Sequence, residues 1–142
     1  MSRFGALFHW AAVIVLVGAT LAAAADSSLS ALPFTVPMGP DGVQRATITL
    51  DSYSYSPEHV IVEAGEPVEL TLTSVTILTP HNFIIDDPAS GLSVEQDVKA
   101  GKTVVVRFTP PRPGVFAMYC DKKLPFFPSH REKGMEGKFE VR

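Results

Sequence analysis

The chain has 142 residues, of which 46% are hydrophobic and 19% are charged, so it is long enough for one globular domain with its own core. This length excludes a large multidomain enzyme. The formal net charge of −3 supplies no broad positive field for a phosphate backbone, so nucleic acid is not an expected partner. The one cysteine, Cys120, has no intrachain disulfide partner and is therefore a packed residue, a free thiol, an intermolecular bridge or a ligand.

Residues 1–25 have the composition of a secretory signal peptide. A short start carrying Arg3 is followed by an apolar stretch and then by the small side chains of residues 22–25. This order predicts cleavage near Ala25 and a periplasmic location for the mature protein. A retained membrane anchor is the alternative, because residues 7–25 approach the roughly 20 residues that span a bilayer. Membrane contact is expected only if this segment is kept.

Residues 26–44 predict an extended N-terminal linker, and residues 45–142 predict a single domain. Serine, proline and glycine are frequent in the linker, which favours weak order over a helix.

Within residues 45–142 the dominant pattern is alternation of apolar and polar residues, which is typical of half-buried strands. Turn residues separate the alternating runs, and about seven or eight short strands result. The sequence therefore predicts an all-β, Greek-key sandwich of two sheets. One run departs from alternation: residues 81–86 contain successive apolar residues, which favours a strand buried on both faces or curling at a sandwich edge.

Four residues of metal-ligating type are placed where loops of a sandwich converge. His81 opens a predicted strand, Cys120 ends another, and His130 and Met135 follow in the next loop. Two imidazoles, a thiolate and a thioether form a soft mixed set that accommodates both Cu(I) and Cu(II). Zinc accepts cysteine and histidine but gains little from methionine.

Four stretches resemble the cupredoxins, the small blue-copper family: residues 55–65, 80–83, 113–120 and 130–137. The similarity extends from Ala46 to Arg142. It implies one copper ion in a type 1-like site, with His81, Cys120 and His130 as equatorial ligands and Met135 as the weak axial ligand. It also implies that Asn82 links the two ligand loops beside the sulfur.

The segment between Cys120 and His130 departs from the family pattern, because its nine residues exceed the few found in plastocyanin-like and azurin-like members. The length leaves blue, green and red copper geometries open. Two further residues have plainer interpretations: His59 is expected to be a solvated histidine, and Met118 a core residue.

The same segment carries an apolar run, residues 124–128, which packs over the metal, or is partly exposed as a docking patch for a redox partner beside His130, or does both. Basic residues surround this run and suggest a positively charged rim that favours an acidic or anionic partner. These residues are Lys122, Lys123, Arg131 and Lys133.

The function expected is that of a one-electron carrier rather than an enzyme. A copper-resistance or copper-delivery protein would use the same four residues, and the sequence does not separate these two functions. A mononuclear copper enzyme requires an open coordination position, which arises only if Met135 does not bind. A Cys-His hydrolase is disfavoured, because no third group is available to orient its base.

Overall fold

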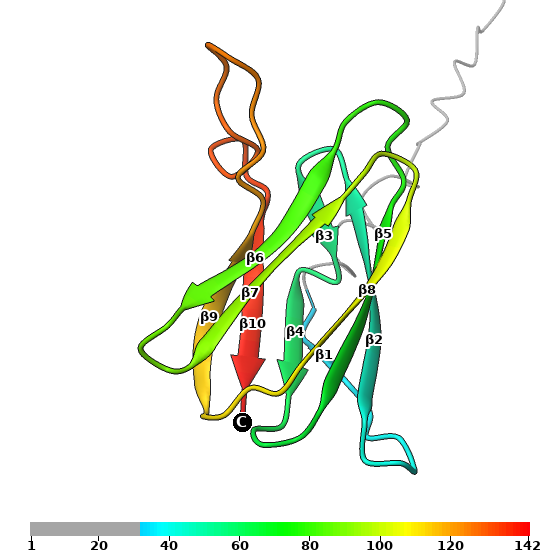
Figure 1. The fold of residues 1–142 in the computed structure, drawn as a ribbon, viewed down its shortest axis with the longest axis vertical. Helices are drawn as coiled ribbons and strands as arrows, with labels where there is room; N and C mark the ends of the chain where they lie inside the picture. Colours follow the sequence, from blue (N-terminus) through cyan, green and yellow to red (C-terminus); the bar gives the residue numbers. More distant parts are fainter. Residues whose placement is uncertain (1–31) are drawn as a thin grey trace, which may run out of the picture.

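The computed structural model describes residues 32–142, so the predicted signal peptide and its cleavage site lie outside the described residues. The described residues form ten strands in two sheets, which confirms the all-β sandwich (Figure 1). The strands are β1 (Phe34–Thr35), β2 (Gln44–Asp51), β3 (Ser54–Ser56), β4 (His59–Val62), β5 (Val68–Ser74), β6 (His81–Asp87), β7 (Leu92–Val98), β8 (Thr103–Phe108), β9 (Gly114–Tyr119) and β10 (Glu136–Val141). Within residues 32–142, no helix has the length and apolar character needed to cross a bilayer.

The larger sheet has the order β1-β4-β10-β9-β6-β7, and the smaller has the order β3-β2-β5-β8. β4 pairs in parallel with both β1 and β10, and β2 pairs in parallel with β5, whereas the other pairs are antiparallel. Eight strands have four or more residues, as the alternation predicts. The two extra strands, β1 and β3, contain only two and three residues and are too short to show a period.

Alternation produces the core because successive side chains of a strand point to opposite faces. Burial alternates along all of β2 and β5, and their inward residues pack in one apolar cluster between the sheets. The exception is β6, where His81 to Ile85 are all buried, as their successive apolar residues indicate. β6 lies between β9 and β7, and the first residue of the strand is the histidine of the predicted site.

Residues 34–36 fall in the stretch for which the sequence predicts an extended, weakly ordered linker. They are extended, and β1 pairs with β4. The Val36 N–H donates to the Ile61 carbonyl at 2.9 Å, and the Val36 side chain is 4% exposed. This part of the stretch therefore packs on the sandwich, because burying Val36 adds apolar area to the core.

Strand direction decides which loops meet. β6 begins where β9 ends, since the two strands are antiparallel and Ile84 pairs with Tyr119. The β2–β3 turn, the β5–β6 loop, the β7–β8 turn and the long β9–β10 segment all lie at this end of the sandwich (Figure 1). We call it the ligand end, because it holds the residues predicted to bind the metal.

Candidate metal centre

Three of the four predicted ligands come together at the ligand end. The possible ligand atoms of His81, Cys120 and His130 lie within 4.8 Å of one another, and all three residues are buried. Cys120 Sγ is 3.3 Å from His130 Nδ1, and the two imidazole rings are 5.1 Å apart between centroids. β6 supplies one imidazole, the end of β9 supplies the thiol, and the segment before β10 supplies the second imidazole.

The environment of His81 shows that this cluster fits a metal ion. Both ring nitrogens of His81 are buried and have no hydrogen-bond partner among the described residues. An unpartnered buried polar atom carries a desolvation cost of about 1–3 kcal/mol, so native proteins rarely keep one. A ring nitrogen that faces a thiol and a second imidazole gains a partner when a soft metal ion binds.

Met135 lies at the same end and is fully buried. Its N–H donates to the His130 carbonyl at 2.9 Å, and its carbonyl accepts from the Cys120 N–H at 3.2 Å. The backbone of the predicted axial residue is thus fixed to both neighbouring predicted ligands. Its role as the axial ligand stays a prediction from the sequence.

Asn82 connects the two ligand segments, in agreement with the family resemblance. Its side-chain amide donates to Asp121 Oδ1 at 2.7 Å and accepts from the Asp121 N–H at 3.1 Å. Its backbone N–H points at Cys120 Sγ, 3.4 Å away, and its carbonyl accepts from the buried Tyr55 hydroxyl at 2.7 Å. Asn82 therefore holds the sulfur in place and donates to it, which stabilises the thiolate form.

One backbone hydrogen bond brings the two ends of the long segment between Cys120 and His130 together. The His130 N–H donates to the Lys122 carbonyl at 2.8 Å, so the chain leaves the site after Lys122 and returns to it at His130. On either side of His130, Ser129 and Glu132 exchange two bonds of the capping-box type, at 2.6 and 3.2 Å. A tight turn follows, in which Gly134 has φ +100°, a conformation that favours glycine.

Residues 123–129, which we call the excursion, project from the ligand end (Figure 1). Leu124, Phe126 and Phe127 are 69%, 105% and 61% exposed, so they do not pack over the metal residues. The prediction that residues 124–128 cover the metal is therefore wrong for these three side chains, and the docking patch stays a prediction. Phe126 has φ +67°, unusual for a bulky residue, and the Phe127 N–H closes a turn on the Leu124 carbonyl.

Tyr53, in the β2–β3 turn, contacts the imidazole of His130 on the side that faces away from the cluster interior. Its ring meets the His130 ring edge-on, with centroids 5.1 Å apart. Lys133 Nζ donates to the Tyr53 hydroxyl at 3.1 Å and lies 4.6 Å from the centre of the Tyr53 ring. The backbone of Tyr53 has φ +63°, and its contact with His130 depends on this turn, so no periodic pattern in the sequence could have revealed it.

Burial sets the protonation of the metal-free cluster. Desolvation raises the pKa of the Cys120 thiol, so the metal-free cysteine keeps its proton. Desolvation, with a smaller contribution from His130, lowers the pKa of His81 to about 4. The pKa of His130 is also lowered, first by burial and then by Lys133. Both imidazoles are therefore neutral and ready to bind at neutral pH, and metal uptake displaces the thiol proton.

The remaining residues singled out by sequence take the following positions. Met118 is a fully buried core residue, as predicted. His59 lies outside the metal cluster. Its side chain is 20% exposed and its Nε2 is 2.9 Å from Glu140 Oε2, so it is half-buried rather than solvated. Two of the four basic residues of the predicted rim are neutralised: Lys122 pairs with Asp97, and Arg131 pairs with Glu136.

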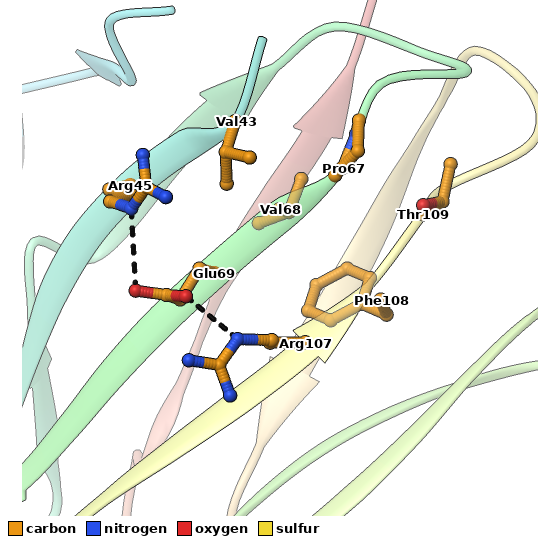
Figure 2. Close-up of a pocket in the computed structure, with 8 residues that line it drawn as sticks. All are labelled: Val43, Arg45, Pro67, Val68, Glu69, Arg107, Phe108 and Thr109. Atoms are coloured by element: carbon orange, nitrogen blue, oxygen red, sulfur yellow. Dashed lines mark hydrogen bonds and ion pairs between the residues drawn. The ribbon is translucent and has the colours of Figure 1, made fainter. Parts of the chain in front are cut away.

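A surface depression of about 390 Å³ lies at the opposite end of the sandwich, on the smaller sheet. Figure 2 shows Glu69 on β5 lying between Arg45 on β2 and Arg107 on β8. The carboxylate contacts one guanidinium at 3.4 Å and the other at 2.7 Å, and Arg45 also pairs with Asp41 at 2.7 Å, so every charge in this row has a partner. We interpret this row as cross-strand stabilisation of the sheet rather than as a binding site.

Together, the sandwich and the buried His–Cys–His cluster define a small β-sandwich metalloprotein. The model of the cupredoxin-like domain family matches residues 11–135, and the chain belongs to this family. The donor set and the family together identify the cofactor as one copper ion in a type 1-like site.

Several solved structures share the fold. The metal-binding domain of the Cu(I)-exporting P-type ATPase CopA of Streptococcus pneumoniae has a TM-score of 0.57 and 19% identity, covering 76% of this chain and 93% of that one. Auracyanin from Roseiflexus castenholzii has a TM-score of 0.57 and 17% identity over 73% and 99%. Auracyanin A from Chloroflexus aurantiacus, a "blue" copper protein, has a TM-score of 0.53 and 21% identity over 69% and 99%. No curated protein sequence matches the chain.

Proposed function

We propose that this protein is a periplasmic one-electron carrier that uses a single copper ion held by His81, Cys120, His130 and Met135. The observation that carries the proposal is the buried cluster itself. Its thiol and two imidazoles lie together in the interior, and His81 and Cys120 are both 0% exposed. A bound copper ion supplies the Cu(II)/Cu(I) couple.

The chain contributes rigidity to electron transfer. Asn82 ties β6 to the segment after Cys120, and the Lys122–His130 bond ties that segment to the second imidazole. A fixed donor set that suits both oxidation states rearranges little when the charge changes, which favours fast exchange. His130 is the most exposed of the three clustered residues at 7%, so it is the expected route for the electron.

The location and the partner belong to the same proposal. Periplasmic location rests on the signal-peptide composition of residues 1–25. We propose that a redox protein, a cytochrome or a respiratory complex, docks near His130 and residues 124–128, whose exposed apolar side chains support such a contact. The protein itself transforms no substrate under this proposal.

The test is the visible spectrum of the recombinant protein loaded with Cu(II). We expect an intense thiolate-to-copper band that bleaches with ascorbate and is lost in Cys120→Ser. A matched pair of methionine variants tests the axial position: Met135→Leu should shift the band and the potential, whereas Met118→Leu, in the core, should leave both unchanged. A copper complex with no such band contradicts the proposal.

A copper-binding or copper-delivery protein is the second candidate function. The fold similarity to the metal-binding domain of a Cu(I)-exporting ATPase favours it. The two functions are distinguished by measuring Cu(I) transfer to a chelator of known affinity together with electron exchange with a cytochrome. Rapid loss of copper without electron exchange supports delivery, and retention of copper through repeated redox cycles supports the carrier.

A further inference from the structure

Tyr53 has a backbone conformation that its residue type does not favour. Asp51 pairs with Ser54 across the β2–β3 hairpin, so Ser52 and Tyr53 form a two-residue turn. Of these two residues, only Tyr53 has a positive φ, at +63°. Turns ordinarily place glycine or asparagine at such a position, because a Cβ atom is crowded there and a bulky side chain adds strain. The turn therefore carries an aromatic residue that the turn itself does not require.

The surface contacts of Tyr53 do not account for this strain. Its side chain is 37% exposed, whereas Tyr55 in the same hairpin is 2% exposed and packs in the core. The Tyr53 hydroxyl accepts from Lys133 Nζ at 3.1 Å, and the ammonium lies 4.6 Å from the ring centre, both at an exposed position. Such exposed contacts contribute little to folding. Strain that folding does not require is characteristic of functional positions.

The remaining contact of the Tyr53 ring is with His130. The two rings meet edge-on, with centroids 5.1 Å apart and planes 75° apart. Elsewhere the His130 ring faces the cluster, since its Nδ1 is 3.3 Å from Cys120 Sγ and its centroid is 5.1 Å from that of His81. The imidazole of His130 thus lies between the buried cluster and a partly exposed aromatic ring.

The orientation of the His130 ring depends on these side-chain neighbours. Its backbone is fixed separately, because its N–H donates to the Lys122 carbonyl and its carbonyl accepts from the Met135 N–H. Backbone bonds leave the side-chain torsions free, so packing decides the direction in which the ring points. At 7% exposure, His130 is also the member of the cluster that solvent reaches most easily. Tyr53 is therefore placed to control both the ring and its solvent contact.

We propose that Tyr53 is a positioning residue of the copper centre, whose ring holds the His130 imidazole against the cluster and keeps water from it. This inference rests on the proposed electron-carrier function and names a residue that tunes it. Water near the site favours Cu(II), the more highly charged ion, so excluding water raises the reduction potential. A held imidazole also slows metal release, because the ring must turn away before the ion can leave.

The experiment compares three variants. Tyr53→Asn removes the ring and supplies a residue that tolerates a positive φ. Tyr53→Phe keeps the ring and removes only the hydroxyl. Phe34→Asn is the matched control, because it removes an aromatic ring of similar exposure, 41%, from β1 at the edge of the larger sheet.

The first measurement uses the metal-free protein. Diethyl pyrocarbonate modifies neutral imidazoles that the reagent can reach, and peptide mass spectrometry gives the rate at His130, with His59 as a reference in the same molecule. An aromatic pair contributes up to about tenfold to an equilibrium constant, so Tyr53→Asn should be modified at His130 about three- to tenfold faster. The rate at His59, and both rates in the other two variants, should stay within about twofold of wild type.

The second measurement uses the copper-loaded protein. We expect Tyr53→Asn to transfer Cu(I) to bathocuproine disulfonate about three- to tenfold faster than wild type and to have a lower midpoint potential. Tyr53→Phe and Phe34→Asn should keep the wild-type potential and transfer copper within about twofold of the wild-type rate. Wild-type behaviour of Tyr53→Phe shows that the ring acts, and not the hydroxyl.

Urea unfolding of the metal-free variants separates positioning from a structural role. Tyr53→Asn should be about as stable as wild type, because relief of the strained turn offsets the lost contacts. If it does not fold, Tyr53→Gly, which adopts a positive φ without strain, repeats the test. Failure of both variants to fold would make Tyr53 a structural residue and overturn the proposal.

Three other outcomes decide between the hypotheses. Wild-type modification at His130 and a wild-type potential in folded Tyr53→Asn would overturn the role of Tyr53. Equal changes in Phe34→Asn would do the same, because loss of any exposed ring would then suffice. Copper that cannot be cycled in any form, wild type included, contradicts the carrier function, whereas the modification and transfer rates still test Tyr53.

Discussion

The segment that joins Cys120 to Met135 contains two regions of opposite character. At its ends Cys120, His130 and Met135 are buried, and hydrogen bonds to Asn82, to Lys122 and between Met135 and Cys120 fix the backbone there. The tip of the excursion between them is exposed, and its Phe127 N–H donates to its own Leu124 carbonyl rather than to the sandwich. Chain length in this segment is therefore a poor guide to the metal site, since only the ends reach it.

The comparison also separates two kinds of constraint. The buried ends are held by packing and by satisfied polar groups, so changes there cost free energy of unfolding and alter the ligands together. The excursion is held at its base alone, so changes at its tip should affect recognition and little else. The following predictions test this separation, from the largest expected effect to the smallest.

Acid should destabilise the metal-free protein through its buried end. The folded protein keeps the pKa of His81 at about 4 because burial disfavours the charged ring, whereas the unfolded chain has the ordinary value near 6.5. Between these values the unfolded state binds a proton that the folded state does not, so stability is full above pH 6.5 and is lost as pH falls toward 4. Urea unfolding of the metal-free protein at pH 7, 5.5 and 4 should show a loss of up to about 3 kcal/mol from this group.

The control for this effect is metal-free His81→Gln, which lacks the titrating ring. Its stability should fall less between pH 7 and pH 4 than that of the wild type. The same slope in both proteins would mean that His81 is not held neutral by the fold.

Asn82→Leu should break the link between β6 and the Cys120 segment. It removes both side-chain bonds and leaves Asp121 without its amide partners, which predicts a loss of about 2 kcal/mol. Chemical unfolding measures the loss, and the copper spectrum reports whether the sulfur moves. Gln96→Leu, which removes an exposed amide on β7, should change the stability by less than about 0.5 kcal/mol. Comparable losses in the two variants would show that Asn82 is not a special link.

Shortening the excursion should leave the metal centre intact. Replacing residues 123–128 with one glycine gives Lys122-Gly-Ser129-His130, in which the existing bond from the His130 N–H to the Lys122 carbonyl becomes the closing bond of a β-turn. We expect the unfolding free energy to change by less than about 1 kcal/mol and the copper spectrum to keep its shape. Loss of copper binding in this variant would show that the excursion belongs to the site.

Tyr53→Phe should have the smallest effect. It keeps the ring against His130 and removes only the hydroxyl that accepts from Lys133, at an exposed position. We expect a change of a few tenths of a kcal/mol in unfolding and no change in copper affinity. A large change in affinity would place the Tyr53–Lys133 pair among the determinants of the metal site.

Much of the fold was predictable because alternation and burial have the same cause. In β2 and β5, the apolar residues at every second position are the ones buried between the sheets. β1 and β3 were not predictable, because strands of two or three residues show no period and exist only through their neighbours. The packing of Val36 likewise depends on β4, far along the chain, and not on local composition.

At the site, residue types carried more information than spacing. His81, Cys120 and His130 were identified because a lone cysteine and two histidines near strand ends form a metal-ligand set, and the structure brings these three together. The basic rim was predictable only as a count of charges. Which of these lysines form ion pairs depends on contacts such as that of Lys122 with Asp97, 25 positions apart, which the sequence alone does not reveal.

The backbone hydrogen bond between Lys122 and His130, at the base of the excursion, has a practical consequence. A peptide inserted between Leu124 and Phe127 would begin and end at points that the fold already holds together, so it would not pull on the sulfur or the imidazole. This hydrogen bond makes the excursion a suitable site for inserting a binding peptide. Such a peptide would lie close to the metal, while the predicted ligands keep their positions.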